Sequence, residues 1–121
     1  DTGSKVREGE ELPVEPLLTW LNSEIKFADG KSLVGKMNVT QYSGGASNWT
    51  YCLSFDNREL ILRRPPAGTK ARGAHDMGRE FKLQDALKPV YSKVPTMLGY
   101  TDDESVIGAE FYVMEKIAGI I

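Results

Sequence analysis

Three strand-like runs rich in aromatic and aliphatic residues follow one another closely between residues 37 and 63. They are residues 37–42, 49–55 and 59–63. A loop of small residues at 43–48 separates the first two runs, and Asp56-Asn57 provides turn chemistry before the third. Pro65-Pro66 ends the third run, because proline has no N–H to donate to a neighbouring strand. The pattern predicts a three-stranded meander whose first hairpin carries a glycine loop.

Helical patterns before and after the meander predict an α+β fold. One set of apolar residues recurs at the spacing of a single face of an amphipathic helix. Its members are Val14, Leu17, Leu18, Leu21 and Ile25. We expect this helix to dock on the sheet, with a partner-binding helix as the alternative. A second helix is predicted at residues 75–90, followed by strands at 96–100 and 109–114. These elements predict a five-stranded antiparallel sheet with one inserted helix and an N-terminal helix.

Length and composition indicate a single globular domain. The chain has 121 residues, of which 40% are hydrophobic and 26% charged, and these values are ordinary for such a domain. Residues 1–13 are polar and are expected to form a tail, which leaves 14–121 as the folded domain. The net charge of −2 argues against nucleic-acid binding, including a β-barrel that stacks single-stranded bases. A single cysteine and a single histidine exclude an internal disulfide and a structural zinc site.

Two further absences in the sequence bear on location. No apolar run reaches the roughly 20 residues that span a membrane. No signal peptide is visible before the first predicted helix. We therefore expect no membrane contact and a cytoplasmic location.

The small-residue loop has the composition of a ligand-binding turn. Adjacent Gly44 and Gly45 let the backbone approach a ligand closely, and backbone N–H groups can cradle phosphate oxygens. Ser47 and Asn48 add polar donors. The loop is not a Walker loop, because no Gly-Lys-Ser/Thr sequence follows it. A plain hairpin connection is the alternative interpretation.

Charged residues occupy two informative positions in the predicted elements. The apolar stripe of the second helix is Met77, Leu83, Leu87 and Val90, with Phe81 at its edge. Glu80 falls within this stripe, where a carboxylate needs a paired cation. Strand alternation places Arg63 on the face of Ile61 and Arg64 on the opposite face, so Arg63 is the natural partner of Glu80. The alternatives are a Glu80 side chain that reaches water at the helix edge and a solvated arginine pair.

Six short runs occur in a fixed order along the chain. They are Gly44-Gly45-Ala46-Ser47-Asn48-Trp49-Thr50-Tyr51, Leu62-Arg63-Arg64-Pro65-Pro66-Ala67-Gly68, Ala74-His75-Asp76-Met77, Arg79-Glu80-Phe81, Val94-Pro95 and Phe111-Tyr112-Val113-Met114-Glu115. In this order they resemble the small ATP-binding lobe of protein-kinase-like phosphotransferases, and specifically the aminoglycoside phosphotransferase family. The resemblance is closest to the branch that occurs alone or fused to acyl-CoA dehydrogenase domains, and it covers residues 14–121. It implies a kinase-like N-terminal lobe.

The resemblance implies roles for individual residues. The loop residues that would cover the ATP phosphates are Gly44, Gly45, Ala46, Ser47 and Asn48. Arg63 takes the position of the cation that contacts the phosphates, and Glu80 that of the helix carboxylate that anchors this cation. Many kinases have lysine where this chain has Arg63. The residues expected around the adenine are Met114 at the gatekeeper position, Glu115 and Ile117 at the base edge, and Thr50 and Ile61 above the base.

The resemblance also implies what this chain leaves to another lobe. In the family, the catalytic aspartate, its neighbouring asparagine and the metal-binding aspartate lie in a second, mostly helical lobe, and the chain ends where that lobe would begin. We expect the parent enzyme to transfer the γ-phosphoryl group of ATP to a small-molecule hydroxyl with Mg²⁺, and the 121-residue chain alone to be inactive. A non-catalytic nucleotide-binding or protein-interaction module is the alternative. Apolar residues near the end are expected to be exposed and to favour self-association, namely Met114, Ile117, Ile120 and Ile121.

Overall fold

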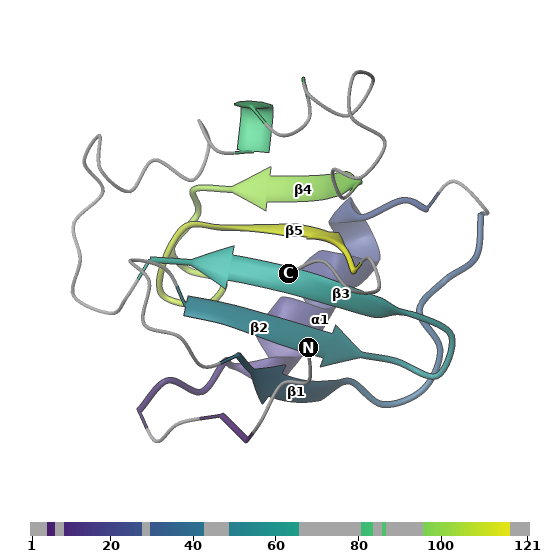
Figure 1. Cartoon of the computed structure of the whole chain (residues 1–121), viewed down its shortest axis with the longest axis horizontal. Coiled ribbons are helices and arrows are strands. Elements are labelled where there is room, and N and C mark those ends of the chain that lie inside the picture. The colour runs from purple at the N-terminus through teal and green to yellow at the C-terminus, as the bar shows by residue number, and fades with distance from the viewer. Residues whose placement is uncertain are drawn as a thin grey trace.

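The chain folds as an antiparallel sheet with a helix on one face (Figure 1). The computed structural model describes residues 5–6, 9–27, 30–42, 49–65, 81–83, 86 and 96–116. Its elements are α1 (Val14–Glu24), β1 (Asn38–Gln41), β2 (Trp49–Ser54), β3 (Glu59–Arg64), β4 (Met97–Thr101) and β5 (Phe111–Glu115). The strands lie in the order β1-β2-β3-β5-β4, and each neighbouring pair is antiparallel. The predicted α+β class and five-stranded sheet are confirmed.

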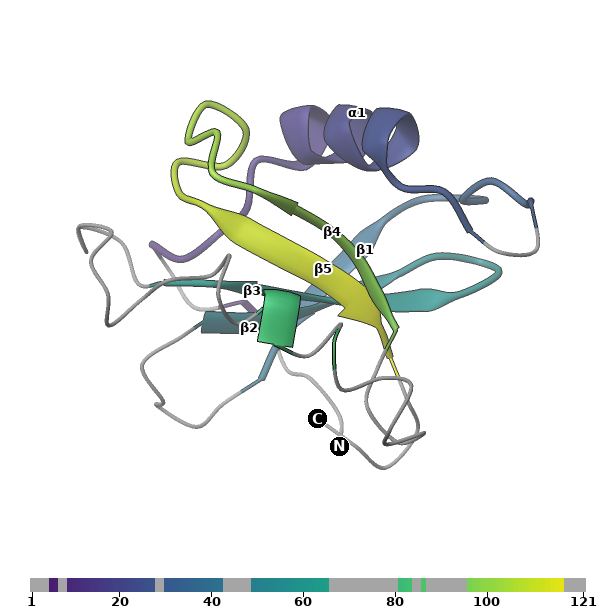
Figure 2. The ribbon, with the colours of Figure 1, turned by 90° about the horizontal axis from the view of Figure 1, so that it is seen from above.

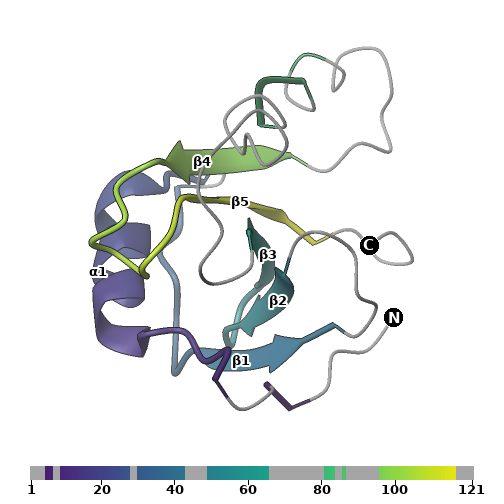
Figure 3. The same ribbon diagram turned by 90° about the vertical axis from the view of Figure 1, so that its left-hand side faces the viewer.

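The predicted N-terminal helix is α1, and it covers one face of the sheet (Figures 2 and 3). Pro16 sits in its first turn, where a missing N–H costs nothing. Leu17 and Leu21 are fully buried, as the apolar spacing predicts. The core cluster that they form with Ile25 includes the sheet residues Tyr51, Leu53, Leu60, Leu62, Phe111 and Val113. The docked-helix interpretation is therefore confirmed.

The contact between α1 and the sheet is close enough to crowd a Cβ atom at one position of β4. A Cβ atom on Gly99 would lie 2.7 Å from Ile25 Cδ1 and 3.1 Å from Trp20 Cη2. The Trp20 ring packs edge-on against Phe111, with 4.8 Å between the ring centroids. This is a favoured arrangement for two aromatic rings. The helix is thus fixed against both β4 and β5.

Part of the expected polar tail is packed against the sheet. The Tyr51 hydroxyl donates a hydrogen bond to the Glu10 carbonyl oxygen at 2.6 Å, and Gln41 Nε2 donates to Glu10 Oε1 at 2.6 Å. Leu12 is buried in the core cluster under α1. The expectation of a fraying tail is wrong for these residues, because Leu12 and Glu10 find partners on distant strands that local composition does not reveal.

The sheet face away from α1 carries a second apolar cluster. Its buried members are Tyr42, Cys52, Ile61, Met97, Tyr112 and Met114. Phe81 packs against this cluster, with its ring centroid 6.4 Å from that of Tyr112. Leu83, which was expected on the apolar stripe, is 60% exposed, so the predicted stripe is wrong at this residue. The spacing that placed Glu80 on the stripe depended on Leu83, and Glu80 itself lies outside the described residues.

Candidate functional site

The strand register brings the expected site residues together on the face away from α1. Thr50 lies opposite Arg63 across β2 and β3, and Arg63 lies opposite Tyr112 across β3 and β5. The neighbouring row on the same face holds Cys52, Ile61 and Met114. Residues directly opposite on adjacent strands share a face and lie within side-chain contact distance. One face therefore carries a cation and an apolar row side by side.

Arg63 is half-buried at the end of β3, on the same face as Ile61, as strand alternation predicts. Its Nη1 donates a hydrogen bond to the Tyr112 hydroxyl oxygen at 3.3 Å. Opposite it, Thr50 is the second residue of β2 and so comes almost directly after the loop at 43–48. The residue opposite Arg63 thus stands, in the sequence, two positions after the segment that was expected to cover phosphates.

Arg64 points to the opposite face and is buried. Its Nε donates to the Pro65 carbonyl oxygen at 2.9 Å, and its Nη1 donates to the Ile107 carbonyl oxygen at 3.4 Å. The guanidinium carbon lies 4.9 Å from the centroid of the Trp49 ring. Burial lowers the pKa of the Arg64 guanidinium from its ordinary value. The interpretation of the two arginines as a solvated pair is therefore wrong.

The other residues expected to contact phosphates lie outside the described residues. These are Gly44, Gly45, Ala46, Ser47, Asn48 and Glu80. Ile117, expected at the base edge, also lies outside them. The Arg63–Glu80 pair stays a prediction. The partner that the structure does describe for the Arg63 guanidinium is Tyr112.

Of the described residues expected around the base, Ile61 and Met114 lie side by side, whereas Thr50 lies in the neighbouring row. Ile61 and Met114 are neighbours in the register and are 1% and 2% exposed. Glu115 follows Met114 at the end of β5 and is half-buried. Cys52, and not Thr50, lies opposite Ile61. Thr50 is one row nearer to the loop, beside the cation.

Cys52 and Tyr112 are the residues of this face that sequence reasoning missed. A tight turn joins β2 and β3, in which Phe55 N donates to the Arg58 carbonyl oxygen at 2.8 Å. Counting back from this turn pairs Cys52 with Ile61, so the Asp56-Asn57 turn signal could have identified it. Tyr112 reaches Arg63 only because β5 inserts beside β3, and no local pattern predicts that pairing.

Polar side chains lie beside the row of Cys52, Ile61 and Met114, on its side away from Arg63. A further polar group, the Tyr42 hydroxyl, belongs to the residue that follows β1. The Tyr42 hydroxyl is buried. Burial, with Cys52 nearby, raises the pKa of Tyr42 above its ordinary value. Cys52 Sγ lies 3.6 Å from Ser54 Oγ and 3.9 Å from Glu59 Oε2. Lys116 Nζ lies 3.3 Å from Glu59 Oε1. Polar groups therefore border the apolar row at Cys52 and at the start of β3.

Met114 does not have the exposure that was expected for it. Its side chain is 2% exposed, because β5 lies inside the sheet between β3 and β4 and Met114 joins the second apolar cluster. The expectation of an exposed Met114 is therefore wrong. The other residues of that expected apolar surface lie outside the described residues, namely Ile117, Ile120 and Ile121. Self-association stays a prediction.

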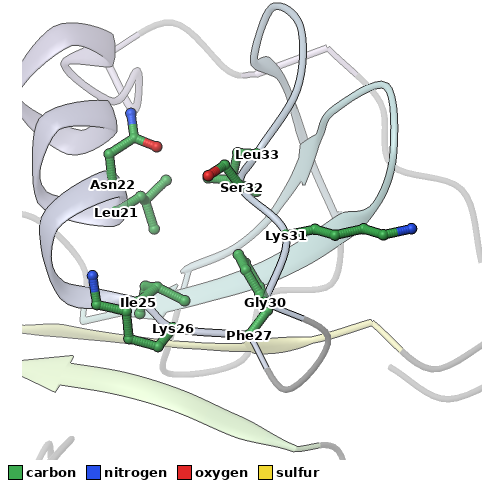
Figure 4. Close-up of a pocket in the computed structure, with 9 residues that line it drawn as sticks. All are labelled: Leu21, Asn22, Ile25, Lys26, Phe27, Gly30, Lys31, Ser32 and Leu33. Atoms are coloured by element: carbon green, nitrogen blue, oxygen red, sulfur yellow. The ribbon is translucent and has the colours of Figure 1, made fainter.

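Hollows elsewhere on the described surface lie away from the Arg63 row. A cavity of about 240 Å³ lies between the end of α1 and residues 25–27 and 30–33, where Leu21 points inward and Lys31 points away (Figure 4). A hollow of about 380 Å³ is lined by Asn57, Arg58, Glu59, Glu115 and Lys116. Within the part of the chain that the structure describes, no three His, Cys, Asp or Glu residues gather closely enough to hold a metal ion. Among the described helices, none has the length and apolarity to cross a membrane.

Comparisons with known proteins agree with the fold. The model of the "Phosphotransferase enzyme family" matches residues 38–121. "Acyl-CoA dehydrogenase family member 10" of Mus musculus is 37% identical over 116 residues, or 96% of this chain. "Acyl-CoA dehydrogenase family member 11" of Homo sapiens is 42% identical over 85 residues, or 70% of this chain. The chain spans only 10% and 11% of the lengths of these two relatives.

A solved structure shows the same arrangement of strands in three dimensions. It is a crystal structure of a candidate aminoglycoside phosphotransferase from Ralstonia eutropha, with a TM-score of 0.68 and 30% sequence identity. The superposition covers 92% of this chain and 30% of that chain. The family match begins at Asn38, the first residue of β1, and includes every strand of the sheet together with Arg63. The chain therefore belongs to the phosphotransferase enzyme family.

Proposed function

We propose that this chain is the ATP-binding lobe of a small-molecule phosphotransferase that transfers the γ-phosphoryl group of ATP to a substrate hydroxyl. The observation that carries the proposal is the position of Arg63, half-buried opposite Thr50, and Thr50 follows the glycine loop at 43–48 by two residues in the sequence. A cation next to backbone N–H groups is an arrangement that binds phosphate oxygens. Membership of the phosphotransferase family supports this choice of ligand.

The proposed roles follow the two rows of the sheet face. Arg63 binds the phosphates, and its planar guanidinium offers two parallel N–H donors where lysine offers a point charge. Thr50 lies on the phosphate side with Arg63. The base packs against Ile61 and Met114, with Cys52 beside them.

The remaining proposed contacts come from the loop, the predicted second helix and the end of β5. The residues that cover the phosphates are Gly44, Gly45, Ala46, Ser47 and Asn48. Glu80 orients Arg63, and the backbones of Glu115 and Ile117 bind the base edge.

Magnesium and the acceptor are proposed to be held elsewhere. The described residues do not supply a metal-binding set, so they do not fit Mg²⁺ by themselves. Mg²⁺ would neutralise charge on the phosphates during transfer, with its ligands in a second lobe. The same lobe would supply the base for the substrate hydroxyl and would choose the acceptor, because the fold of this lobe does not determine it.

A non-catalytic nucleotide-binding or protein-interaction module is a second candidate. The low exposure of Ile61 and Met114, 1% and 2%, favours the protein-interaction form of this module, because the surface proposed to meet the base is already covered. The two candidates differ in whether the protein transfers a phosphoryl group once a second lobe is present. Transfer to an alcohol by the intact two-lobed protein supports the enzyme, and binding without transfer supports the module.

Titration of the 121-residue chain with ATP, followed by NMR, tests the proposed site directly. We expect a dissociation constant of roughly millimolar or weaker, because one wall of the cleft belongs to the second lobe. Arg63→Ala should remove binding, whereas Lys36→Ala, at an exposed position before β1, should leave it unchanged. Sub-micromolar affinity, or ATP-dependent phosphorylation of an alcohol by this chain alone, would contradict the proposed division between lobes. Absence of any shift in the Arg63 row would contradict the site.

A further inference from the structure

Tyr112 offers Arg63 a fixed contact on the sheet. The two residues lie opposite each other in the register of β3 and β5, and Arg63 Nη1 donates to the Tyr112 hydroxyl oxygen at 3.3 Å. Tyr112 is 0% exposed, and its strand is paired on both sides, with β3 and with β4. The Tyr112 ring is also packed 6.4 Å from the Phe81 ring. The hydroxyl therefore occupies a fixed place, while arginine is a long and flexible side chain.

The chemistry of this acceptor suits a cation that must also bind an anion. A tyrosine hydroxyl is neutral at physiological pH, so it can accept a hydrogen bond from the guanidinium without cancelling its charge. A carboxylate in the same place would restrain the arginine equally well but would compete with a phosphate for it. Restraint before binding also reduces the side-chain freedom that is lost when a ligand binds.

We propose that Tyr112 is a positioning residue that holds the Arg63 guanidinium ready for the nucleotide phosphates. The proposal rests on the proposed ATP site, and it adds a residue on β5 to that site. It also means that Arg63 is oriented by the sheet itself. This contact from β5 adds to the orientation that Glu80 is proposed to give Arg63.

Tyr100 provides a matched control on the same face. It lies on β4 directly opposite Tyr112, one strand farther from Arg63. Its ring is packed 6.2 Å from the Phe81 ring, but its hydroxyl donates to Glu110 Oε1 at 3.2 Å. Tyr100→Phe and Tyr112→Phe therefore remove the same atom from facing residues, one half-buried and one buried, and of these two hydroxyls the one that contacts Arg63 is that of Tyr112.

The experiment compares the ¹⁵N-labelled 121-residue chain with its Tyr112→Phe and Tyr100→Phe variants. The first readout is the side-chain N–H signals of Arg63, which should stay resolved in the parent chain and Tyr100→Phe and should merge in Tyr112→Phe. The second is titration with ADP and ATP. We expect affinity to fall about three- to tenfold in Tyr112→Phe, the effect of one hydrogen bond, and to stay within about twofold in Tyr100→Phe.

Each outcome decides between the inference and the function on which it rests. Unchanged Arg63 signals and unchanged affinity in Tyr112→Phe would overturn the inference while leaving the ATP site intact. A parent chain that binds no nucleotide would overturn the proposed function and the inference with it, and the Arg63 signals would still show whether Tyr112 restrains the guanidinium. A Tyr112→Phe chain that fails to fold would assign the hydroxyl a structural role and overturn the inference.

A double-mutant cycle separates positioning from a general effect of the hydroxyl. Arg63→Lys keeps the charge but changes the reach and hydrogen-bond geometry of the side chain. If Tyr112 acts through the guanidinium, Tyr112→Phe should weaken nucleotide binding in the parent and change it little in the Arg63→Lys background. Equal losses in both backgrounds would contradict the inference.

Discussion

Arg63 and Arg64 are neighbours on β3, yet their side chains lie on opposite faces of the sheet in different surroundings. Arg64 is buried on the α1 face, where its guanidinium donates to two backbone carbonyl oxygens and lies over the Trp49 ring. Arg63 is half-buried on the other face and contacts a neutral hydroxyl. The difference shows that strand alternation can bury one arginine within the fold and leave the next half-exposed on the other face.

The face that holds Arg64 depends most on α1, so Leu21→Ala should produce the largest loss of stability. Leu21 is 0% exposed beneath the helix, and its truncation leaves a cavity. We expect the free energy of unfolding to fall by about 3 kcal/mol. Urea denaturation measures it, with Val14→Ala as a control on the same helix at a site 44% exposed. Similar losses at both positions would mean that α1 does not carry the core of this face.

Arg64→Ala sharpens the comparison between the two arginines. It removes a buried guanidinium with two hydrogen bonds to carbonyl oxygens and an aromatic contact. We expect a loss of about 2 kcal/mol in the free energy of unfolding, against less than about 0.5 kcal/mol for Arg63→Ala. Nucleotide binding should show the reverse order. Equal effects on unfolding would break the assignment of one arginine to the fold and the other to a ligand.

Gly99→Ala tests how tightly α1 is held to β4. The added methyl would lie 2.7 Å from Ile25 Cδ1, so the Ile25 side chain or the backbone of β4 must shift. We expect a loss of about 1 kcal/mol in thermal or chemical unfolding. Ile25→Val removes the Cδ1 atom, and the double variant should recover part of that loss. Failure of the second change to compensate would place the strain elsewhere.

Tyr42→Phe should have the smallest effect, and it lies on the Arg63 face. Burial raises the pKa of Tyr42, so on raising the pH the unfolded chain loses this proton first. Stability is therefore unaffected by this group below its unfolded value of 10.0 and falls as the pH rises through the folded value. Tyr42→Phe should make that alkaline decline shallower and change stability at pH 7 by less than about 0.5 kcal/mol. Denaturation midpoints between neutral and alkaline pH provide the measurement, and an unchanged alkaline slope would contradict the prediction.

Local patterns in the sequence were sufficient to predict α1 and the strands, and to predict how β2 pairs with β3. The spacing of Leu17, Leu21 and Ile25 predicts α1 because helix periodicity is a property of neighbouring residues. The turn at Asp56-Asn57 likewise determines that Ser54 pairs with Glu59. The opposite faces of Arg63 and Arg64 follow from alternation on one strand.

Contacts between distant segments were beyond those patterns. The pairing of Arg63 with Tyr112 joins residues 49 positions apart and exists only because β5 lies beside β3. The contacts of Glu10 with Tyr51 and Gln41 join an apparently polar tail to the sheet in the same way. Phe81, expected at the edge of the apolar stripe, packs against the sheet, whereas Leu83, expected on the stripe, is exposed. A few apolar residues do not determine which side of a helix is buried.

The buried position of the single cysteine makes it possible to measure how often the Arg63 face opens. Cys52 is 3% exposed on β2, where it lies opposite Ile61 and its Sγ is 3.9 Å from Glu59 Oε2. A thiol reagent in solution can react with it only when this face opens. Its labelling rate in the unaltered protein therefore reports the frequency of local unfolding, and any ligand that binds this face should slow that rate.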